Sequence, residues 1–170
     1  MTDILPFSEI IRLNEIGTGL SRHLRPDGET RMKIARSLDL ASLDAFEAEV
    51  KVAPARTGWT LSGRITADAV QTCGLTLEPL PVKLDERFEI ALVEAEEPVE
   101  GDELEVTLDD DAPDVVEDGR IDLGVYAVEQ LALNLDPFPR KPGAEFVQPE
   151  EPAEVSPFAV LKAFRAPDES

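Results

Sequence analysis

Alternation of apolar and polar residues dominates the middle of the chain. Within residues 44–54 every second residue from Phe46 to Val52 is apolar, which predicts a half-buried strand that Pro54 ends. Residues 57–70 repeat the pattern, with Trp59 and Ile65 on the apolar side. The connection ARTG carries a glycine, so we expect these two strands to form a hairpin.

Residues 71–95 predict another pair of strands. Apolar residues again stand at every second position, at Val82 and Leu84 and then at Phe88, Ile90 and Leu92. The sequence EPLP breaks the chain between the two runs. An opening strand is expected over residues 3–13, with Pro6 at a sheet edge or at the strand start, since proline cannot donate to a central ladder. Several strands at such short spacing favour an antiparallel sheet.

Helical spacing occurs in two places. Residues 14–28 are rich in turn formers, and residues 29–40 predict a helix whose apolar face includes Met32 and Leu38, with its basic residues outward. A second helix is expected from Asp122, a good N-cap, to Leu135, packed on the sheet through Leu123, Val128, Leu131 and Leu135. Asp136-Pro137 ends it, because a residue before proline leaves the α region.

The expected fold class is therefore α+β, a mainly antiparallel β-sheet with a packed C-terminal helix and an acidic loop. One domain is expected over residues 1–146. The DPFPRKPG segment (136–143) predicts an extended, polyproline-like strap. Residues 147–170 predict a linker and a short docking helix, in which Phe158 and Leu161 lie on the apolar face.

Charge is the strongest feature of the composition. The chain of 170 residues carries 36 acidic and 16 basic side chains, a net charge of −20. Sixteen acids and one base, Arg87, fall within residues 85–118, where LEVTL (104–108) predicts one short strand and DDDAPD (109–114) a loop. Such a block repels phosphate backbones, because nucleic-acid affinity comes largely from lysine and arginine. Its natural partner is a basic protein, although the same acids could serve solubility alone.

Few residues suggest catalysis. His23 is the only histidine and Cys73 the only cysteine, so neither a histidine-dependent triad nor a zinc site of about four ligands is expected. Asp109, Asp110 and Asp111 could hold a divalent cation loosely, which leaves a metal-dependent hydrolase as a remote alternative. We predict no enzyme and no cofactor. A modest basic patch leaves direct RNA binding open, through Arg22, Arg25, Arg31, Lys33 and Arg36.

Nothing in the chain predicts a membrane or secreted protein. No run of about 18 apolar residues is present. The opening MTDILPFSEI lacks the basic and apolar regions of a secretory signal, and a single cysteine gives no reason for an oxidising compartment. We expect a cytoplasmic protein.

Three segments together resemble the YceD family of bacteria and plastids. They are CGLTLEPLP (73–81), EDGRIDLGVYAVEQLALNLDPFPRKPG (117–143) and SPFAVLKAF (156–164). The resemblance implies a role in the accumulation of large-subunit ribosomal RNA and no defining enzymatic activity. Many members carry Cys-x-x-Cys, whereas this chain has Thr76 at the second position and Arg140 and Lys141 where some members have a further cysteine. A metal site therefore does not carry over.

A role in RNA accumulation and a charge of −20 are compatible if the protein acts on RNA indirectly. We expect it to bind a basic ribosomal protein or assembly factor, or a pre-ribosomal particle, with an acidic, partly mobile segment over residues 94–118 attracting the partner. The candidate partner-binding residues are Glu78, Pro79, Asp109, Asp110, Asp111, Asp122, Glu129, Pro137, Phe138, Pro139, Phe158 and Leu161.

Overall fold

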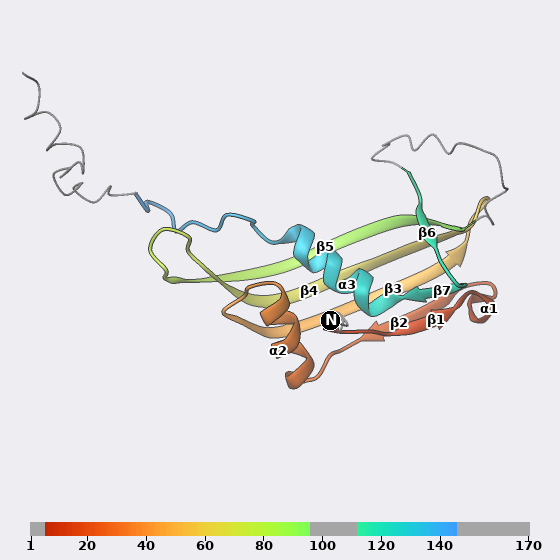
Figure 1. Ribbon diagram of the computed structural model, residues 1–170, viewed down its shortest axis with the longest axis horizontal. Helices are drawn as coiled ribbons and strands as arrows, with labels where there is room; N and C mark the ends of the chain where they lie inside the picture. The colour runs from red at the N-terminus through yellow and green to blue at the C-terminus, as the bar shows by residue number, and fades with distance from the viewer. Residues whose placement is uncertain (1–5, 96–111, 146–170) are drawn as a thin grey trace, which may run out of the picture.

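A curved five-stranded sheet forms the body of the molecule (Figure 1). The structure is a computed structural model, and it describes residues 6–95 and 112–145. The sheet order is β2-β3-β4-β5-β6, antiparallel throughout except for the parallel β5–β6 pair. Its strands are β2 (Leu20–Leu24), β3 (Ser42–Pro54), β4 (Trp59–Thr72), β5 (Pro79–Glu94) and β6 (Asp114–Val116). A separate antiparallel ribbon pairs β1 (Ile10–Arg12) with β7 (Arg120–Asp122).

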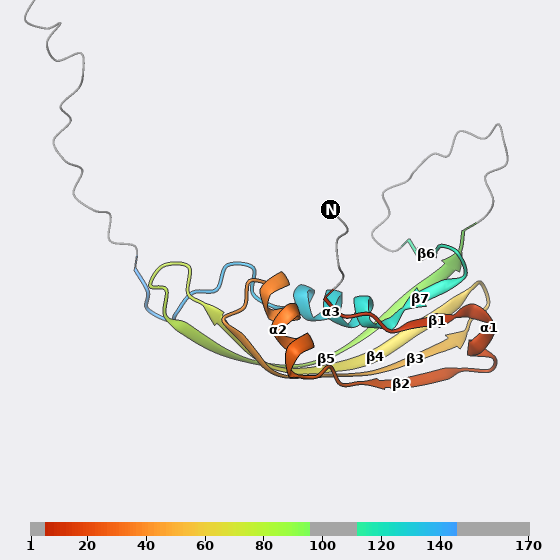
Figure 2. The same ribbon diagram turned by 60° about the horizontal axis from the view of Figure 1, so that its bottom comes forward.

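The other elements cover one face of this sheet. Figure 2 shows the helices α2 (Gly28–Ser37) and α3 (Leu123–Asn134) and the β1–β7 ribbon on its concave side. The short helix α1 (Leu13–Ile16) follows β1 at one end. Among the described residues, no element covers the convex face (Figure 2). The core lies between the concave face and its cover, and it includes Phe46, Ile65, Leu92 and Leu131.

One aspartate joins α3 to the N-terminal segment. Asp122 Oδ1 accepts hydrogen bonds from the backbone N–H groups of Gly124 (3.0 Å) and Val125 (3.2 Å), which caps the helix. The same oxygen accepts one from the backbone N–H of Glu9 (2.8 Å), and the hydroxyl of Ser8 donates to Oδ2. A Cβ on Gly124 would lie 2.8–2.9 Å from the backbone of Ser8 and Glu9, so this close packing depends on glycine.

The central strands and the C-terminal helix confirm the predictions. β3 and β4 form the expected hairpin, with Pro54 opposite Trp59, and Phe46, Val52 and Ile65 are buried. The α+β class with a mainly antiparallel sheet is confirmed. Leu123, Val128 and Leu131 of α3 are buried and Leu135 packs against the core, so the helix covers the sheet as expected.

The N-terminal predictions need two corrections. Of the strand predicted over residues 3–13, residues 3–5 lie outside the described residues; from residue 6 on, the strand is Ile10–Arg12, and Pro6 lies outside it. The turn-rich stretch contains a strand, β2, that the sequence did not predict. Its middle residues Ser21, Arg22 and His23 are all exposed, so apolar alternation is absent, and pairing with β3 forms the strand.

Residues 71–95 hold one strand and not two. Gln71 and Thr72 end β4, residues 73–78 form a turn, and β5 then runs for 16 residues from Pro79. Prolines 79 and 81 stand at the start of β5, where a missing N–H is tolerated, so they begin the strand and do not separate two strands.

Helix α2 ends three residues earlier than predicted. Asp39 has φ 53°, and the N–H groups of Asp39 and Leu40 bond to the carbonyls of Arg36 and Ala35, which is a Schellman ending. Met32, expected on the apolar face, is exposed, and Arg31, expected outward, is half-buried. Buried Ile34 and Ala35 carry the packing of this helix.

The last predictions concern the loops. The strap follows α3 as predicted. Its backbone is irregular rather than a regular polyproline-like segment, and it contains a turn at residues 141–144. Asp118 (φ 54°) and Gly119 (φ 63°) form a tight turn between β6 and β7, two short strands that the sequence did not predict. The strand expected at 104–108, the boundary at 146/147 and the C-terminal docking helix lie outside the described residues. No helix that the structure describes has the length and apolar character needed to cross a membrane.

Candidate functional site at the turn and the strap

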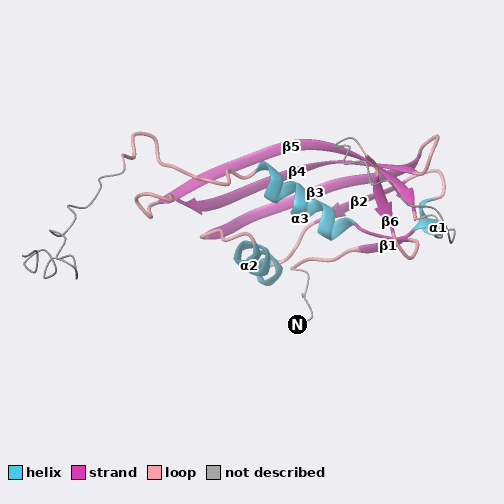
Figure 3. Cartoon of the chain, turned by 45° about the horizontal axis from the view of Figure 1, so that its top comes forward, coloured by secondary structure: helices cyan, strands magenta, loops and turns pink. Residues whose placement is uncertain are grey.

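Two segments far apart in sequence meet at one end of the sheet. The β4–β5 turn (residues 73–78) lies beside the strap, the segment of residues 136–143 described above (Figure 3). The backbone N–H of Gly74 donates to the carbonyl of Pro139 (2.9 Å). The amide of the buried Gln71 donates to the carbonyl of Asp136 (2.8 Å), so this buried polar side chain is satisfied by the strap.

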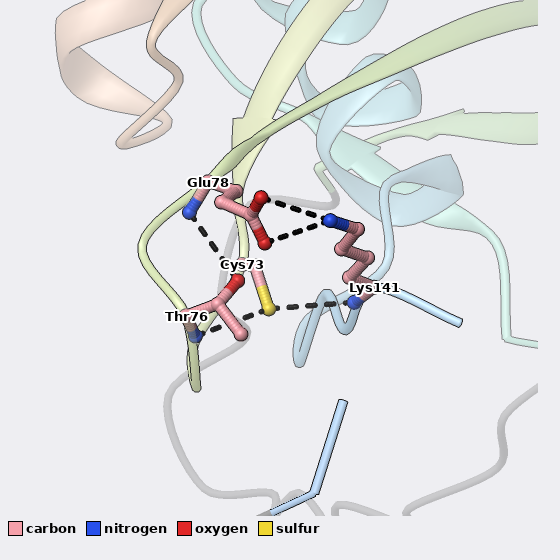
Figure 4. A network of polar contacts seen from close by, with 4 residues as sticks. All are labelled: Cys73, Thr76, Glu78 and Lys141. Atoms are coloured by element: carbon pink, nitrogen blue, oxygen red, sulfur yellow. Dashed lines mark hydrogen bonds and ion pairs between the residues drawn. The ribbon is translucent and has the colours of Figure 1, made fainter. Parts of the chain in front are cut away.

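Cys73 lies beneath this contact. It is 0% exposed, and its Sγ accepts hydrogen bonds from the backbone N–H groups of Thr76 (3.4 Å) and Lys141 (3.3 Å) (Figure 4). The side-chain hydrogen bond of Thr76, followed by the backbone bonds of Lys141 and Thr76, lowers the pKa of Cys73 to about 6. Hydrogen bonds that favour the charged form lower the pKa of this thiol, and burial acts against them by raising it. Burial sets it apart from a reactive cysteine, which needs access.

An ion pair closes the same contact from outside. Lys141 Nζ lies 2.8 and 3.0 Å from the two carboxylate oxygens of Glu78 (Figure 4). Hydrogen bonding to Lys141 lowers the pKa of Glu78, and the same bond raises the pKa of Lys141. Both side chains are about half exposed, so solvent weakens the pair. We call Cys73, Thr76, Glu78 and Lys141 the clasp, because together they hold the strap on the turn.

The clasp leaves two large apolar side chains in solvent. Leu77 is 77% exposed and has φ 60°, a conformation that is costly for a leucine. Two backbone hydrogen bonds, both 2.9 Å, hold Leu77 in this conformation. The N–H of Leu77 donates to the carbonyl of Cys73, and the N–H of Cys73 donates to the carbonyl of Glu78. Phe138 of the strap is 75% exposed.

A groove of about 470 Å³ lies beside the strap. It runs between the end of α2, the turn and the last residues of α3, and its lining includes Leu38, Leu75, Leu135 and Phe138. Its charged lining residues are Asp39, Asp136 and Arg140. A mixed apolar and polar groove of this kind suits contact with another polypeptide better than it suits a deeply enclosed small ligand.

The structure brings together five of the predicted partner-binding residues. Glu78 and Pro79 at the start of β5 and Pro137, Phe138 and Pro139 of the strap all lie at this end. Asp122 caps α3 and binds the N-terminal segment, which is a structural role. Glu129 lies on α3 beside another groove. Asp109, Asp110, Asp111, Phe158 and Leu161 lie outside the described residues.

Sequence reasoning did not assign Gln71, Cys73, Thr76 or Lys141 to this site. Cys73 is buried and lies just after the end of β4. Thr76 and Lys141 occupy positions where members of the YceD family carry cysteines, and Cys73 occupies the first position of that pattern. Cysteines that share a site lie close together, so this pattern is the sequence signal that the β4–β5 turn and the strap meet. No sequence signal marks Gln71, because a polar residue near a strand end is ordinary.

The basic residues of the RNA-binding alternative are spread over β2, the following loop and α2. Arg25 pairs with Glu47 (3.3 Å) and Lys33 with Glu29 (2.8 Å). Arg31 donates to the Pro26 carbonyl (3.0 Å) and braces the start of α2. Arg22 and Arg36 are exposed. Within residues 6–95 and 112–145, no group of three or more histidine, cysteine, aspartate or glutamate side chains is placed to hold a metal ion.

Comparison with known proteins gives one match. The family model described as large ribosomal RNA subunit accumulation protein YceD matches residues 61–165, from β4 through the strap and beyond. No curated protein and no solved structure matches the chain significantly. The matched region covers more than half of the 170 residues and contains all four residues of the clasp. The chain therefore belongs to the YceD family, the large ribosomal RNA subunit accumulation proteins.

Proposed function

We propose that this protein supports the accumulation of large-subunit ribosomal RNA indirectly, as a non-enzymatic, cytoplasmic acidic protein that binds a basic ribosomal protein or assembly factor. Family membership supports the ribosome-related role. The observation that carries the indirect mechanism is the net charge of −20. Such a charge repels RNA phosphates and speeds the encounter with cationic polypeptide.

The ion pairs of the described residues strengthen this argument. Five lysine and arginine side chains are held by acids: Arg25, Lys33, Arg64, Lys83 and Lys141. A paired cation offers a phosphate less net positive charge than a free one. The bound cations therefore reduce the surface on which RNA could bind directly, while the acidic excess remains available.

The turn and the strap supply the apolar part of the proposed contact. Leu77 and Phe138 are exposed at the same end of the molecule, beside the groove. The clasp fixes this end, so little conformational entropy is lost when a partner binds. Charge then sets the rate of encounter, and the apolar contact resists dissociation.

Capture of ribosomal proteins from lysate tests the proposal. The full chain, immobilised by an affinity tag, should recover basic ribosomal proteins after nuclease treatment, with recovery falling as salt rises. Neutralising the predicted acidic site through Asp109→Asn and Asp110→Asn should lower recovery. The matched control is Asp44→Asn with Glu49→Gln, which changes net charge equally at two exposed positions of β3.

Direct RNA binding predicts the opposite pattern. Under that alternative, nuclease treatment abolishes recovery, and charge reversal at Arg22 and Arg36 weakens it. Both side chains are exposed, and neither takes part in an ion pair among the described residues, so their reversal should leave the fold intact. Recovery that survives nuclease and both reversals supports protein binding. Salt-insensitive recovery, or recovery of RNA alone, contradicts the proposal.

A further inference from the structure

The outer edge of β5 is open along its middle. β5 pairs with β4 along its whole length, but β6 covers its other edge only at residues 92–94. Among the described residues, β4 is the one strand that pairs with residues 85–91, and no backbone hydrogen bond reaches their outer edge. An open edge is a row of unpaired N–H and C=O groups that can pair with an added strand.

The chain itself shows that this edge accepts a strand. β6 pairs with it in parallel, Leu92 opposite Asp114 and Glu94 opposite Val116. Ala95 extends the contact through a hydrogen bond from its N–H to the Val116 carbonyl (3.1 Å). Residues 85–91 continue the same edge without a break in the strand. A second segment placed there would therefore lie in line with β6.

A groove of about 520 Å³ lies beside residues 89–91 of this stretch, between β5 and α3. Ile90, Asp114, Tyr126, Glu129 and Leu133 contribute to its lining, and no lysine, arginine or histidine is among the described residues that form it. Leu133 (75% exposed) and Val115 (57% exposed) provide apolar surface on α3 and β6. The combination suits a side chain with an aliphatic stem and a cationic end.

The acids of this groove influence one another. Burial, followed by the negative charge of Asp114, raises the pKa of Glu129. Burial, again followed by the charge of Asp114, raises the pKa of Tyr126 to about 12. A cation placed between these groups would relieve the repulsion and would keep Glu129 ionised.

We infer that residues 85–91 of β5, together with this groove, bind an extended basic segment of the partner by β-strand addition. The inference rests on the proposed function and specifies how the partner docks. Backbone pairing supplies affinity, and alternate side chains of the added strand point toward the groove. A second copy of the chain fits poorly, because each copy carries a net charge of −20 and the exposed Glu86 and Glu89 of this stretch outnumber its one base, Arg87.

Hydrogen exchange with a synthetic peptide tests the inference. The probe is a peptide of alternating arginine and threonine, added to the full-length protein at low salt. Its binding should slow exchange of amides in residues 85–91, with little change in β3. The same peptide N-methylated at every amide keeps its charge but cannot donate a backbone hydrogen bond from either edge, so it should give no protection.

Protein variants test the groove separately. Glu129→Gln should weaken peptide binding roughly fivefold, as expected for a partly exposed charge pair. The matched control Glu49→Gln, on β3, should change it much less. The inference is overturned by equal binding of the N-methylated peptide or by protection elsewhere than residues 85–91. It is overturned as well if the outward-facing amides of that stretch, those not bonded to β4, are already protected in the free protein. Peptide-independent association of the protein with itself through this edge overturns it as well.

The outcome is distinguishable from failure of the proposed function. If the protein recovers ribosomal proteins from nuclease-treated lysate while residues 85–91 stay unprotected in those complexes, the function stands and edge docking is wrong. If no basic protein is recovered, the function fails, whatever the synthetic peptide does. Protection of residues 85–91 by both the peptide and the recovered partner supports the inference.

Discussion

Lys141 of the strap reaches back to Glu78 of the β4–β5 turn, with its ammonium nitrogen 2.8 and 3.0 Å from the two carboxylate oxygens, although 63 residues separate them. The backbone N–H of the same lysine donates to Cys73 Sγ. One residue thus holds the strap on the turn through both its side chain and its backbone. Phe138 lies three residues earlier in the same strap and is 75% exposed.

The ion pair should contribute little to global stability and more to local order. In a double-mutant cycle with Glu78→Gln and Lys141→Met, we expect a coupling free energy of about 0.2–1 kcal/mol, because both groups are half exposed. The amide of Gly74, bonded to Pro139, should exchange faster in each single variant. Urea unfolding and hydrogen exchange measure the two effects. Lys83→Met, which breaks the Lys83–Asp68 pair, is the control and should leave Gly74 unchanged.

Cys73 should make stability depend on pH in a defined direction. Its pKa is lowered from 9.0 to about 6 in the folded protein, so the folded state releases this proton more readily than the unfolded chain. The resulting stabilisation is complete above about pH 9, grows between pH 6 and 9, and is lost as pH falls through 6. Cys73→Ser keeps a hydrogen-bond acceptor but does not ionise. Urea unfolding should therefore show a steeper rise with pH for the native chain, and parallel curves would contradict the prediction.

Two helix-capping aspartates should differ in importance. Asp27 accepts one backbone N–H, that of Thr30, whereas Asp122 accepts those of Gly124 and Val125 and also holds Ser8 and Glu9. Asp27→Ala should lower the free energy of unfolding by about 1 kcal/mol. Asp122→Ala should lower it by roughly 2 kcal/mol or more and speed exchange at Glu9, because the N-terminal segment is released. Equal losses in urea unfolding would show that the tie to Ser8 and Glu9 adds nothing.

Gly63 should tolerate no side chain. A Cβ there would lie 2.7 Å from the Glu49 carbonyl oxygen and 2.7 Å from the Phe88 ring, so β3 or the ring must move. Gly63→Ala should cost about 1–3 kcal/mol in thermal or urea unfolding. Gly28→Ala is the matched control, since its Cβ would meet only Arg31 Nη2 at 3.9 Å. Alanine favours a helix, so this control should be neutral or slightly stabilising.

Local patterns predicted the elements whose burial is periodic. The alternation of β3 and β4 and the capped helix α3 are visible in sequence because each buries one regular face. β2 and β6 were missed because main-chain pairing with a neighbour forms them, and their own side chains are mostly exposed. The clasp has no local signature either. Its partners belong to segments 63 residues apart, and only the folded sheet brings Glu78 to Lys141.

Phe138 should matter for partner binding and not for folding. The side chain is 75% exposed, so Phe138→Ser should change the free energy of unfolding by no more than about 0.5 kcal/mol. If the strap contacts the partner, the same change should sharply reduce recovery of ribosomal proteins from nuclease-treated lysate. Met32→Ser removes another exposed apolar side chain, from α2, and should leave recovery intact. Equal recovery by both variants would exclude the strap from the interface, whereas a selective loss with unchanged stability would place Phe138 in direct contact with the partner.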